Sequence, residues 1–273
     1  MKILHPNHTK PLPLNALKEY LKDGIYDIID PKEREKLNYF LHCFEAYRKS
    51  NNLIIKDDSL YDNLPFSIHT DEWKERQKDI YIINKKIHNR KNLNILDVGS
   101  WNGWLSNYLA KKGHNVTALN LFRDEYDGLL SKNKYNTKYL SLQIQIEELY
   151  RIKDQFDLII FNRNWAFFKD YQKVFMDAKD MLTDNGEIII TGLAFYKNPV
   201  KALGNLEYIN KKFLEKYKIP IIYNDSKGFL DTSDFDFFLK NKISLHSYQK
   251  VKNLFKFIFP KKAKVYYGSY KKA

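Results

Sequence analysis

Between residues 93 and 191 the chain alternates short apolar runs with helix-like stretches, and this alternation constrains the fold more than any other feature. The predicted strands are NILDV (94 to 98), NVTAL (115 to 119), KYLSLQI (138 to 144), FDLIIF (156 to 161) and EIIIT (187 to 191). The predicted helices between them are WLSNYLAKK (104 to 112), EYDGLLSK (125 to 132) and YQKVFMDAKDML (171 to 182). Continuous apolar strands that alternate with helices are typical of a parallel sheet buried on both faces. The sequence therefore predicts an α/β fold with right-handed crossovers.

The segments on either side of this core have different patterns. Residues 1 to about 90 are expected to be mostly helical, because the apolar spacing of 32 to 49 is that of one helix face. A second helix is expected after Thr70, which is placed to cap it. Its predicted inward-facing residues are Trp73, Ile80, Ile83 and Ile87. Beyond residue 191 we expect a long connector (193 to 231), a helix in DTSDFDFFLK, and two strands, ISLHSY and AKVYYGSY, that end the sheet in an antiparallel arrangement.

Composition narrows the class of protein. The chain has 273 residues, 44% of them hydrophobic and 15% aromatic, which excludes a disordered chain. Cys43 is the single cysteine and cannot form an internal disulfide, as is typical of a reducing compartment. The N-terminus lacks the continuous apolar stretch of a signal peptide, and no run approaches the ~18 apolar residues of a membrane span. We therefore expect a cytoplasmic protein.

The formal net charge of +13 has several interpretations. The basic residues are 39 Lys and only 7 Arg, and arginine is the usual residue for bidentate contacts to phosphates and bases. A dedicated nucleic-acid reader is therefore disfavoured. From Phe237 to Ala273 there are ten lysines, interleaved with aromatics, and no Asp or Glu. This stretch is interpreted either as a contact with an anionic membrane or as an outer strand of the sheet with a solvated face.

The loop after the first predicted strand is where an open parallel sheet binds its ligand. It reads Asp97-Val98-Gly99-Ser100-Trp101-Asn102-Gly103. Gly99 permits a sharp turn and a close backbone approach to a ligand, and Gly103 lets the next helix pack near the strand. The loop has neither the G-x-G-x-x-G of a dinucleotide site nor the G-x-x-x-x-G-K-S/T of a phosphate loop.

With its acidic residue two positions before the first glycine, this loop resembles motif I of the class I S-adenosylmethionine-dependent methyltransferases, commonly (D/E)-x-G-x-G-x-G. The resemblance continues through LDVGSWNGWLSNYLAKKGHNVTALNL, IEELY, QFDLIIFN and DMLTDNGEIII, and is to the large bacterial group that includes the quinone-biosynthesis methyltransferases. It implies S-adenosylmethionine as cofactor and a Rossmann-like fold whose mostly parallel seven-stranded sheet has an antiparallel last strand. The expected domains are a helical N-terminal cap (1-90) and a methyltransferase domain (91-273) with a substrate-cap insertion at about 193-231.

The family's roles, carried over by position, imply a cofactor site. Asp97 would hold the methionine amino group, while the backbone of Gly99, Ser100 and Gly103 would wrap the methionine and ribose. The implied cofactor-binding residues are Asp97, Gly99, Ser100, Trp101, Gly103, Asn120, Leu121, Gln145, Ile146 and Asn162. Arg163, Asn164, Trp165 and Phe168 would follow on the substrate side, although aromatic residues here are equally interpreted as core.

Three positions depart from the family pattern. Trp101 replaces a glycine, and is tolerable only if its backbone is ordinary and its ring lies away from the ligand or over it. Asn120 and Gln145 stand where the family has acids for the ribose hydroxyls and the adenine amine. Their amide oxygens can still accept hydrogen bonds, so we expect binding weakened by ~10- to 50-fold rather than abolished.

In-line methyl transfer requires alignment more than a general base. The weak candidates for a catalytic residue are His69 and Tyr196, with Asp225 or Asp231 behind them. No metal site is expected. The favoured function is methylation of a small molecule or a glycan or lipid precursor. Two alternatives stay open: an inactive methyltransferase fold that serves as a binding protein, and an RNA methyltransferase.

Overall fold

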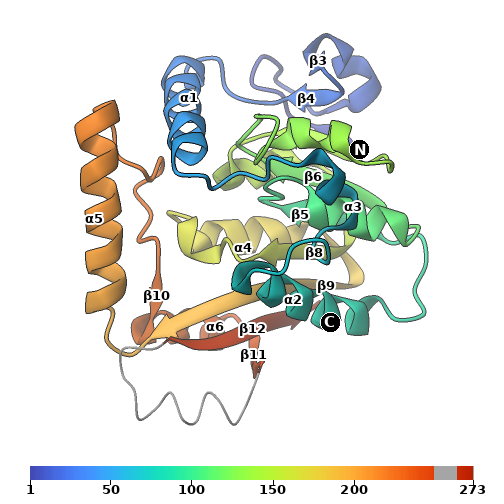
Figure 1. Ribbon diagram of the computed structural model, residues 1–273. Coiled ribbons are helices and arrows are strands. Elements are labelled where there is room, and N and C mark those ends of the chain that lie inside the picture. The colour runs from blue at the N-terminus through green and yellow to red at the C-terminus, as the bar shows by residue number, and fades with distance from the viewer. Residues whose placement is uncertain (249–262, 273) are drawn as a thin grey trace.

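The computed structural model describes residues 1–248 and 263–272, which form a mixed sheet covered by helices on both faces (Figure 1). Seven of its strands are β5 (Asn94–Val98), β6 (Asn115–Asn120), β7 (Leu140–Gln143), β8 (Phe156–Asn162), β9 (Leu182–Tyr196), β11 (Ser244–Ser247) and β12 (Lys264–Lys271). Their spatial order is β7-β6-β5-β8-β9-β12-β11, and β12 runs antiparallel to both of its neighbours. The predicted α/β fold with an antiparallel last strand is confirmed.

The direction of winding reverses at β5. The chain passes from β5 outward to β6 and β7, then returns to place β8 on the other side of β5. In an open parallel sheet such a reversal leaves a crevice at the carboxyl ends of the strands, because the two adjoining crossovers diverge there. The loops after β5, β6 and β8 meet at this crevice.

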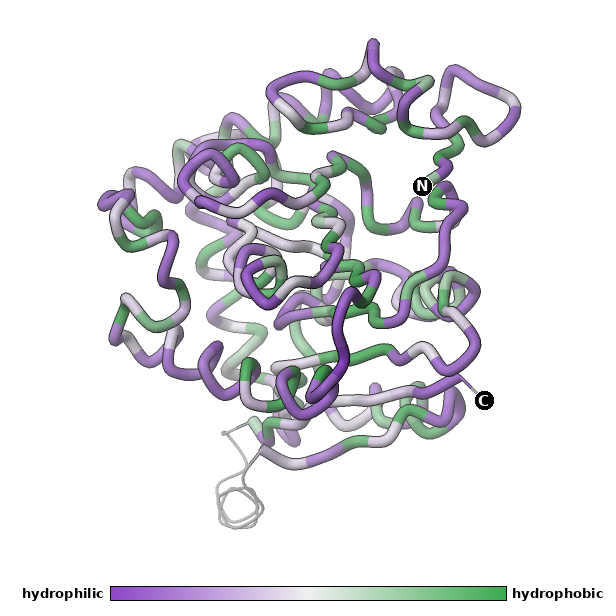
Figure 2. Tube along the Cα trace, turned by 90° about the vertical axis from the view of Figure 1, so that its right-hand side faces the viewer, coloured by the Kyte–Doolittle hydropathy of each residue, from purple (hydrophilic) through white to green (hydrophobic). Residues whose placement is uncertain are grey.

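Helices cover both faces of the sheet because alternate strand residues point to opposite sides. On one face Ile95, Ile160 and Ile189 pack with α2 (Asp71–Ile87) and α3 (Trp104–Lys111). On the other face Leu96 and Ile159 pack with α4 (Tyr171–Asp180) and α6 (Phe235–Lys240). Figure 2 shows the hydrophobic segments running through the interior of the molecule. The inward-facing residues predicted for α2 are all buried, although Thr70 makes no side-chain cap hydrogen bond.

The first thirty residues differ from the helical expectation. They form β1 (Lys2–Ile3), β2 (Leu12–Pro13), a 3-10 helix (Leu14–Tyr20), β3 (Leu21–Lys22) and β4 (Ile25–Asp27), and only then does α1 (Arg34–Ser50) begin. β4 pairs in parallel with β7 and extends the main sheet. Strands of two or three residues are too short to show a period of two, so the sequence pattern could not predict them. The domain boundary near residue 90 stays a prediction.

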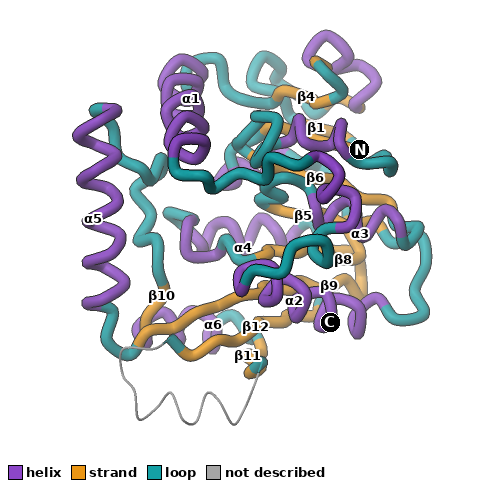
Figure 3. Tube along the Cα trace, viewed as in Figure 1, coloured by secondary structure: helices purple, strands orange, loops and turns teal. Residues whose placement is uncertain are grey.

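The expected connector contains a long helix that the sequence analysis did not predict. α5 (Val200–Tyr217) is followed by β10 (Leu230–Asp231), which pairs in parallel with the end of β9. α5 stands at the edge of the molecule beside α1 (Figure 3) and buries Phe213 against Phe44 and Tyr47.

The other 3-10 helices are Asp58–Asn63, Leu129–Lys134, Ile146–Arg151, Trp165–Phe167 and Thr232–Asp234. The helix expected at 125 to 132 is therefore a turn followed by a 3-10 helix.

The basic C-terminal stretch is only partly described. Lys264–Lys271 form β12, which lies between β9 and β11 inside the sheet. Lys261 and Lys262 lie outside the described residues, so the membrane interpretation stays a prediction. Within residues 1–248 and 263–272, the structure contains no helix with the length and apolar character needed to cross a bilayer.

The pairing of β4 with β7 makes the N-terminal segment part of the main core. Ile28, which follows β4, is fully buried, and its N–H donates to the carbonyl of Gln143 at 2.9 Å. We expect Ile28→Ala to lower the free energy of unfolding by about 2–4 kcal/mol. The control Leu21→Ala, at a side chain that is 40% exposed, should cost much less. Urea unfolding measures both, and equal small losses would show that the segment is only loosely attached.

Candidate functional site

The turn from β5 into α3 depends on three residues with positive φ. These are Gly99 (68°), Trp101 (51°) and Gly103 (75°). A Cβ on Gly99 would lie 2.3 Å from the amide nitrogen of Asn164, and one on Gly103 would lie 2.1 Å from the hydroxyl of Tyr139. The expectation of an ordinary backbone at Trp101 is wrong. A left-handed conformation costs a residue with a Cβ about 1–2 kcal/mol, so other contacts must hold Trp101 in place.

Trp101 is held by both its backbone and its ring. The Nδ2 of Asn120 donates to the carbonyl of Trp101 at 3.0 Å. The indole stacks on Trp73 of α2, with 5.8 Å between centroids and 17° between planes. The guanidinium groups of Arg76 and Arg48 lie 4.7 and 5.6 Å from its centroid. The ring therefore forms part of the wall of the crevice and leaves its centre open.

Both ends of the Asn120 carboxamide form hydrogen bonds with the protein's own backbone. Its Nδ2 donates to Trp101, and its Oδ1 accepts from the N–H of Leu121 at 2.9 Å. An aspartate here could accept from Leu121 but could not donate to Trp101, because an ionised carboxylate has no proton to give. One hydrogen bond thus links two departures from the family pattern, the tryptophan in the loop and the amide at the end of β6.

A cavity of about 830 Å³ opens at the carboxyl ends of β5, β6, β7 and β8. Nine of the ten predicted cofactor-binding residues line it, namely Asp97, Gly99, Ser100, Trp101, Asn120, Leu121, Gln145, Ile146 and Asn162. Gly103 instead caps the start of α3 and packs against Tyr139. The volume is in the upper part of the range for small-molecule sites, so the cavity can hold a nucleoside-sized ligand together with a small acceptor.

Asp97 is an acid whose ionisation depends on its surroundings. It is 1% exposed, and its Oδ2 accepts from the hydroxyl of Ser106 at 2.7 Å. Burial raises the pKa of Asp97 to about 7, although the hydrogen bonds from Ser106 act to lower it. A cationic group placed in the cavity would favour the ionised form. Asp97 therefore suits the ammonium group that the family resemblance assigns to it.

Several polar atoms in the cavity wall have no hydrogen-bond partner among the described residues. They are Arg76 Nε, Ser100 Oγ, Asp127 Oδ1 and Asn164 Oδ1. An unmade hydrogen bond costs a buried group about 1–3 kcal/mol. These atoms are buried, so they lie within the cavity wall and not on its open surface.

The loop after β8 is fixed by a carboxylate on α2 that the sequence analysis missed. Asp79 is fully buried and accepts from Asn162 Nδ2 at 3.0 Å, from Arg163 Nε at 2.6 Å and from the hydroxyl of Tyr248. Arg163 has a φ of 57°, and a Cβ on Gly192 would lie 2.4 Å from its Cγ. Asp79 gave no signal in the sequence, because it lies on a helix rich in charged residues.

The structure separates the four predicted substrate-side residues into two groups. Arg163, Asn164 and Phe168 line the cavity. Trp165 is 2% exposed and packs in the core, with its ring 4.9 Å from that of Phe161. For Trp165 the core interpretation therefore holds.

The candidate catalytic residues lie away from the cavity. His69 is exposed just before α2, and Tyr196 ends β9, and neither is among the lining residues. Asp225 pairs with Lys169, and Asp231 pairs with Lys227. Their catalytic role stays a prediction, and nothing in their placement supports it.

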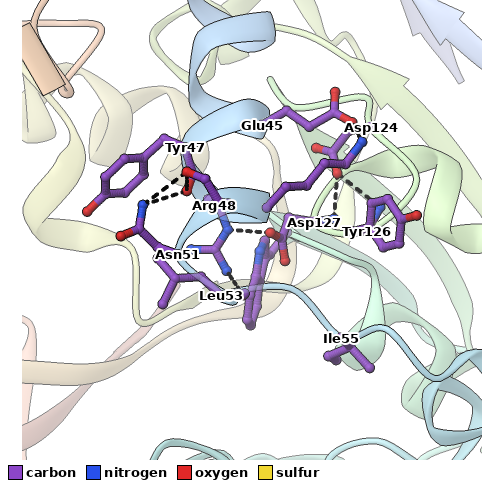
Figure 4. A network of polar contacts seen from close by, with 12 residues as sticks. Glu45, Tyr47, Arg48, Asn51, Leu53, Ile55, Asp124, Tyr126 and Asp127 are labelled. Carbon is purple, nitrogen blue, oxygen red and sulfur yellow. Dashed lines mark hydrogen bonds and ion pairs between the residues drawn. The ribbon is translucent and has the colours of Figure 1, made fainter. Parts of the chain in front are cut away.

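Charged residues that the sequence analysis missed lie in the cavity wall instead. Arg48 of α1 pairs with Asp127, which follows β6, and its Nη2 donates to the carbonyl of Leu53, as Figure 4 shows. Glu147 lies near Ile146 and accepts from Asn224 at 2.6 Å. These pairs join elements that are far apart in the sequence, so periodicity and spacing could not indicate them.

The strand order, the loop and the cavity define a Rossmann-like α/β protein with one ligand crevice at the reversal of winding. Residues 96–190 match a family model described as a methyltransferase domain. A malonyl-[acyl-carrier protein] O-methyltransferase of Buchnera aphidicola is 25% identical over 175 residues, which are 62% of this chain and 70% of that protein. Residues 96–190 therefore form a methyltransferase domain, and the cavity at the reversal of winding is its candidate S-adenosylmethionine site.

Solved structures share the fold at low sequence identity. The plantazolicin methyltransferase BamL, in complex with a triazolic desmethylPZN analogue and S-adenosylhomocysteine, aligns with a TM-score of 0.52 and 15% identity over 88% of this chain and 97% of that one. The plantazolicin methyltransferase BpumL, with S-adenosylhomocysteine, aligns with a TM-score of 0.51 and 14% identity over 89% and 97%.

The raised pKa of Asp97 predicts a pH-dependent gain in stability for Asp97→Asn. Unfolded, this acid ionises near its usual 3.8, but folded it ionises near 7. The stability of the apoprotein should therefore fall as pH rises from about 4 to 7, and the asparagine variant should avoid this loss. We expect a gain of about 4 kcal/mol at pH 8 that disappears near pH 4. Denaturant unfolding across this range measures it, and a gain independent of pH would contradict the assignment.

The hydrogen bond between Asn120 and Trp101 predicts the effect of restoring the family's acid. Asn120→Asp removes the donor to the Trp101 carbonyl and places a charge beside it. We expect a loss of about 1–3 kcal/mol in stability and weaker binding of S-adenosylhomocysteine. Asn205→Asp, at an exposed residue of α5, is the control. Tighter binding by Asn120→Asp in calorimetry would show that the loop does not depend on this bond.

Proposed function

We propose that the enzyme methylates a small acceptor with a substantial apolar part, held in the portion of the cavity beneath α1 and α5. The observation that carries this proposal is the lining of that portion. It consists of Phe40, Phe44, Leu53, Phe122, Leu206, Ile209, Ile221, Ile222 and Tyr223. Apolar and aromatic walls bind ligands mainly by removing their apolar surface from water.

Ring contacts close this part of the cavity. The ring of Phe40 lies 5.0 Å from that of Tyr223, and the ring of Phe44 lies 5.0 Å from that of Phe122. These contacts join α1 to the connector and to the loop after β6. Residues 1-90 and 193-231 would therefore act together as the cap over the acceptor, as the domain prediction proposes.

Methyl transfer requires little from the protein beyond alignment of the acceptor with the methyl group of the cofactor. The bound cofactor supplies an electrophilic methyl group on a sulfonium, and an amine or phenolate acceptor needs only to be aimed at it in a site that excludes water. A hydroxyl acceptor would also need a base. Among the carboxylates that line the cavity, Asp127 pairs with Arg48 of α1 and Glu147 accepts from Asn224 of the connector.

The ion pairs of the cavity weigh against RNA as the acceptor. Arg48 pairs with Asp127, and Arg163 pairs with Asp79, so neither guanidinium is available as an uncompensated charge for a phosphate. A glycan would leave its hydroxyls facing the apolar wall without hydrogen-bond partners. A lipid precursor or an aromatic compound fits the lining better.

Acceptor screening tests the proposal. Release of S-adenosylhomocysteine should accompany incubation with some member of a panel of alkyl or aromatic amines, phenols and acyl carboxylates. Phe44→Ala should raise the KM for that acceptor about 10-fold while leaving the affinity for S-adenosylhomocysteine unchanged. Activity confined to RNA, monosaccharides or malonyl-[acyl-carrier protein], the substrate in the relative's name, would contradict an apolar acceptor.

A further inference from the structure

α5 has little contact with the rest of the molecule. It stands at the edge, where α1 and the chain that leads to β10 lie beside it (Figures 1 and 3). Phe213 is the one buried residue among those of α5 whose burial the structure describes. The other apolar side chains of this helix are at least partly exposed to water, and apolar residues gathered on a protein surface mark an interaction site.

Three exposed apolar residues of α5 form a stripe along one side of the helix. Val200, Leu203 and Leu214 are 71%, 42% and 45% exposed. They follow one another after three and eleven residues, which are close to one and three turns of an α-helix. Leu214 directly follows Phe213 and therefore projects about 100° away from it. The stripe is thus turned to solvent, away from the contact with α1.

Basic residues border this stripe. From Lys211 to Lys218 four of the eight residues are lysine and one is glutamate, and the four lysines are exposed. Lys211 lies three residues before Leu214 and so on the same side of the helix. Glu207 is the one acidic residue of α5 on that side. An apolar stripe bordered by lysines is typical of a helix that lies in the headgroup region of an anionic bilayer.

The apolar surface of α5 continues into the cavity. Leu206 and Ile209 line the cavity, and Ile209 is also 36% exposed. Tyr39 of α1 is exposed, and its hydroxyl donates to the carbonyl of Tyr217 at 3.0 Å. This contact places an amphipathic side chain beside the basic end of the helix. Surface that faces solvent and surface that faces the cavity therefore meet along one helix.

We propose that α5 docks the protein on an anionic membrane, with Val200, Leu203 and Leu214 inserted among the lipid headgroups. The lysines of 211–218 complement the phosphates, and the net charge of +13 attracts the same surface from a distance. A second copy of the chain fits this face less well, because a two-fold interface sets each patch, with its lysines, against itself. An apolar acceptor can then pass from the bilayer into the cavity, and this consequence alone rests on the proposed function.

Flotation with lipid vesicles tests the docking surface. We expect the wild type to float with vesicles of phosphatidylcholine and phosphatidylglycerol but not with phosphatidylcholine alone, and to be released by salt. Leu203→Ser combined with Leu214→Ser should weaken partitioning about 10-fold or more, because serine has little apolar surface to remove from water. Lys211→Gln combined with Lys212→Gln should weaken it about 5-fold for each lysine.

A fluorophore on the stripe locates the contact. Cys43, the single cysteine, is buried, so Leu203→Cys can be labelled selectively with an environment-sensitive dye. The dye's emission should shift to the blue on the anionic vesicles, whereas the same dye at Leu21→Cys should keep its emission. Leu21 is a matched position, because it is 40% exposed and lies on β3, at the opposite side of Figure 1 from α5.

Leu21→Ser and Lys22→Gln, both on β3, are the control variants and should partition as the wild type does. Every variant should keep the circular dichroism of the wild type, which excludes a folding defect. The inference is overturned if the wild type fails to float with the anionic vesicles, or if the α5 variants float equally well. It is also overturned if the wild type sediments as a dimer that Leu203→Ser with Leu214→Ser dissociates, because a second copy then covers this face. Since these readouts report membrane binding alone, failure of the proposed acceptor class would leave them intact.

Discussion

The hydrogen bond from Asn120 to the carbonyl of Trp101 is the contact on which the crevice depends. The chain must turn sharply between β5 and α3, and it does so with a tryptophan in a conformation that favours glycine. The cost of about 1–2 kcal/mol is offset by this bond and by stacking of the indole on Trp73. Without both contacts the loop would relax, and the bulky ring would be free to enter the space that the cofactor needs.

Electrostatics inside the crevice differ from those of the molecule as a whole. The chain has a net charge of +13, yet the three arginines of the cavity each face a carboxylate: Arg48 faces Asp127, Arg76 faces Glu72 and Arg163 faces Asp79. Asp127 and Asp79 are buried, so removing Arg48 or Arg163 would leave a buried charge uncompensated, which costs far more than an exposed pair contributes. The basic character of the sequence therefore says little about the ligand, because no lysine within residues 1–248 and 263–272 lines the cavity.

The sequence predicted those parts of the fold that a repeating pattern encodes. The strands around Ile95 and Ile160 and the buried face of α2 follow from periodicity, and the crevice follows from the order of strands. β4 and α5 were not predicted. β4 has only three residues, and Phe213 is the one buried residue among those of α5 whose burial the structure describes. In the site, the roles of residues that act through their backbone could be predicted from their positions in the family motif. Partners such as Asp79 and Asp127 could not, since they join elements that meet only in the folded chain.

One face of α2 contacts the loops on both sides of the crevice and so fixes their relative positions. Trp73, Arg76 and Asp79 are three residues apart and so share a face of this helix. The first two contact Trp101 in the loop after β5, and the third binds Asn162 and Arg163 after β8. A shift of α2 would therefore move both loops together. Because the two loops come from adjacent strands on either side of the reversal of winding, a single rigid helix can hold open the space between them.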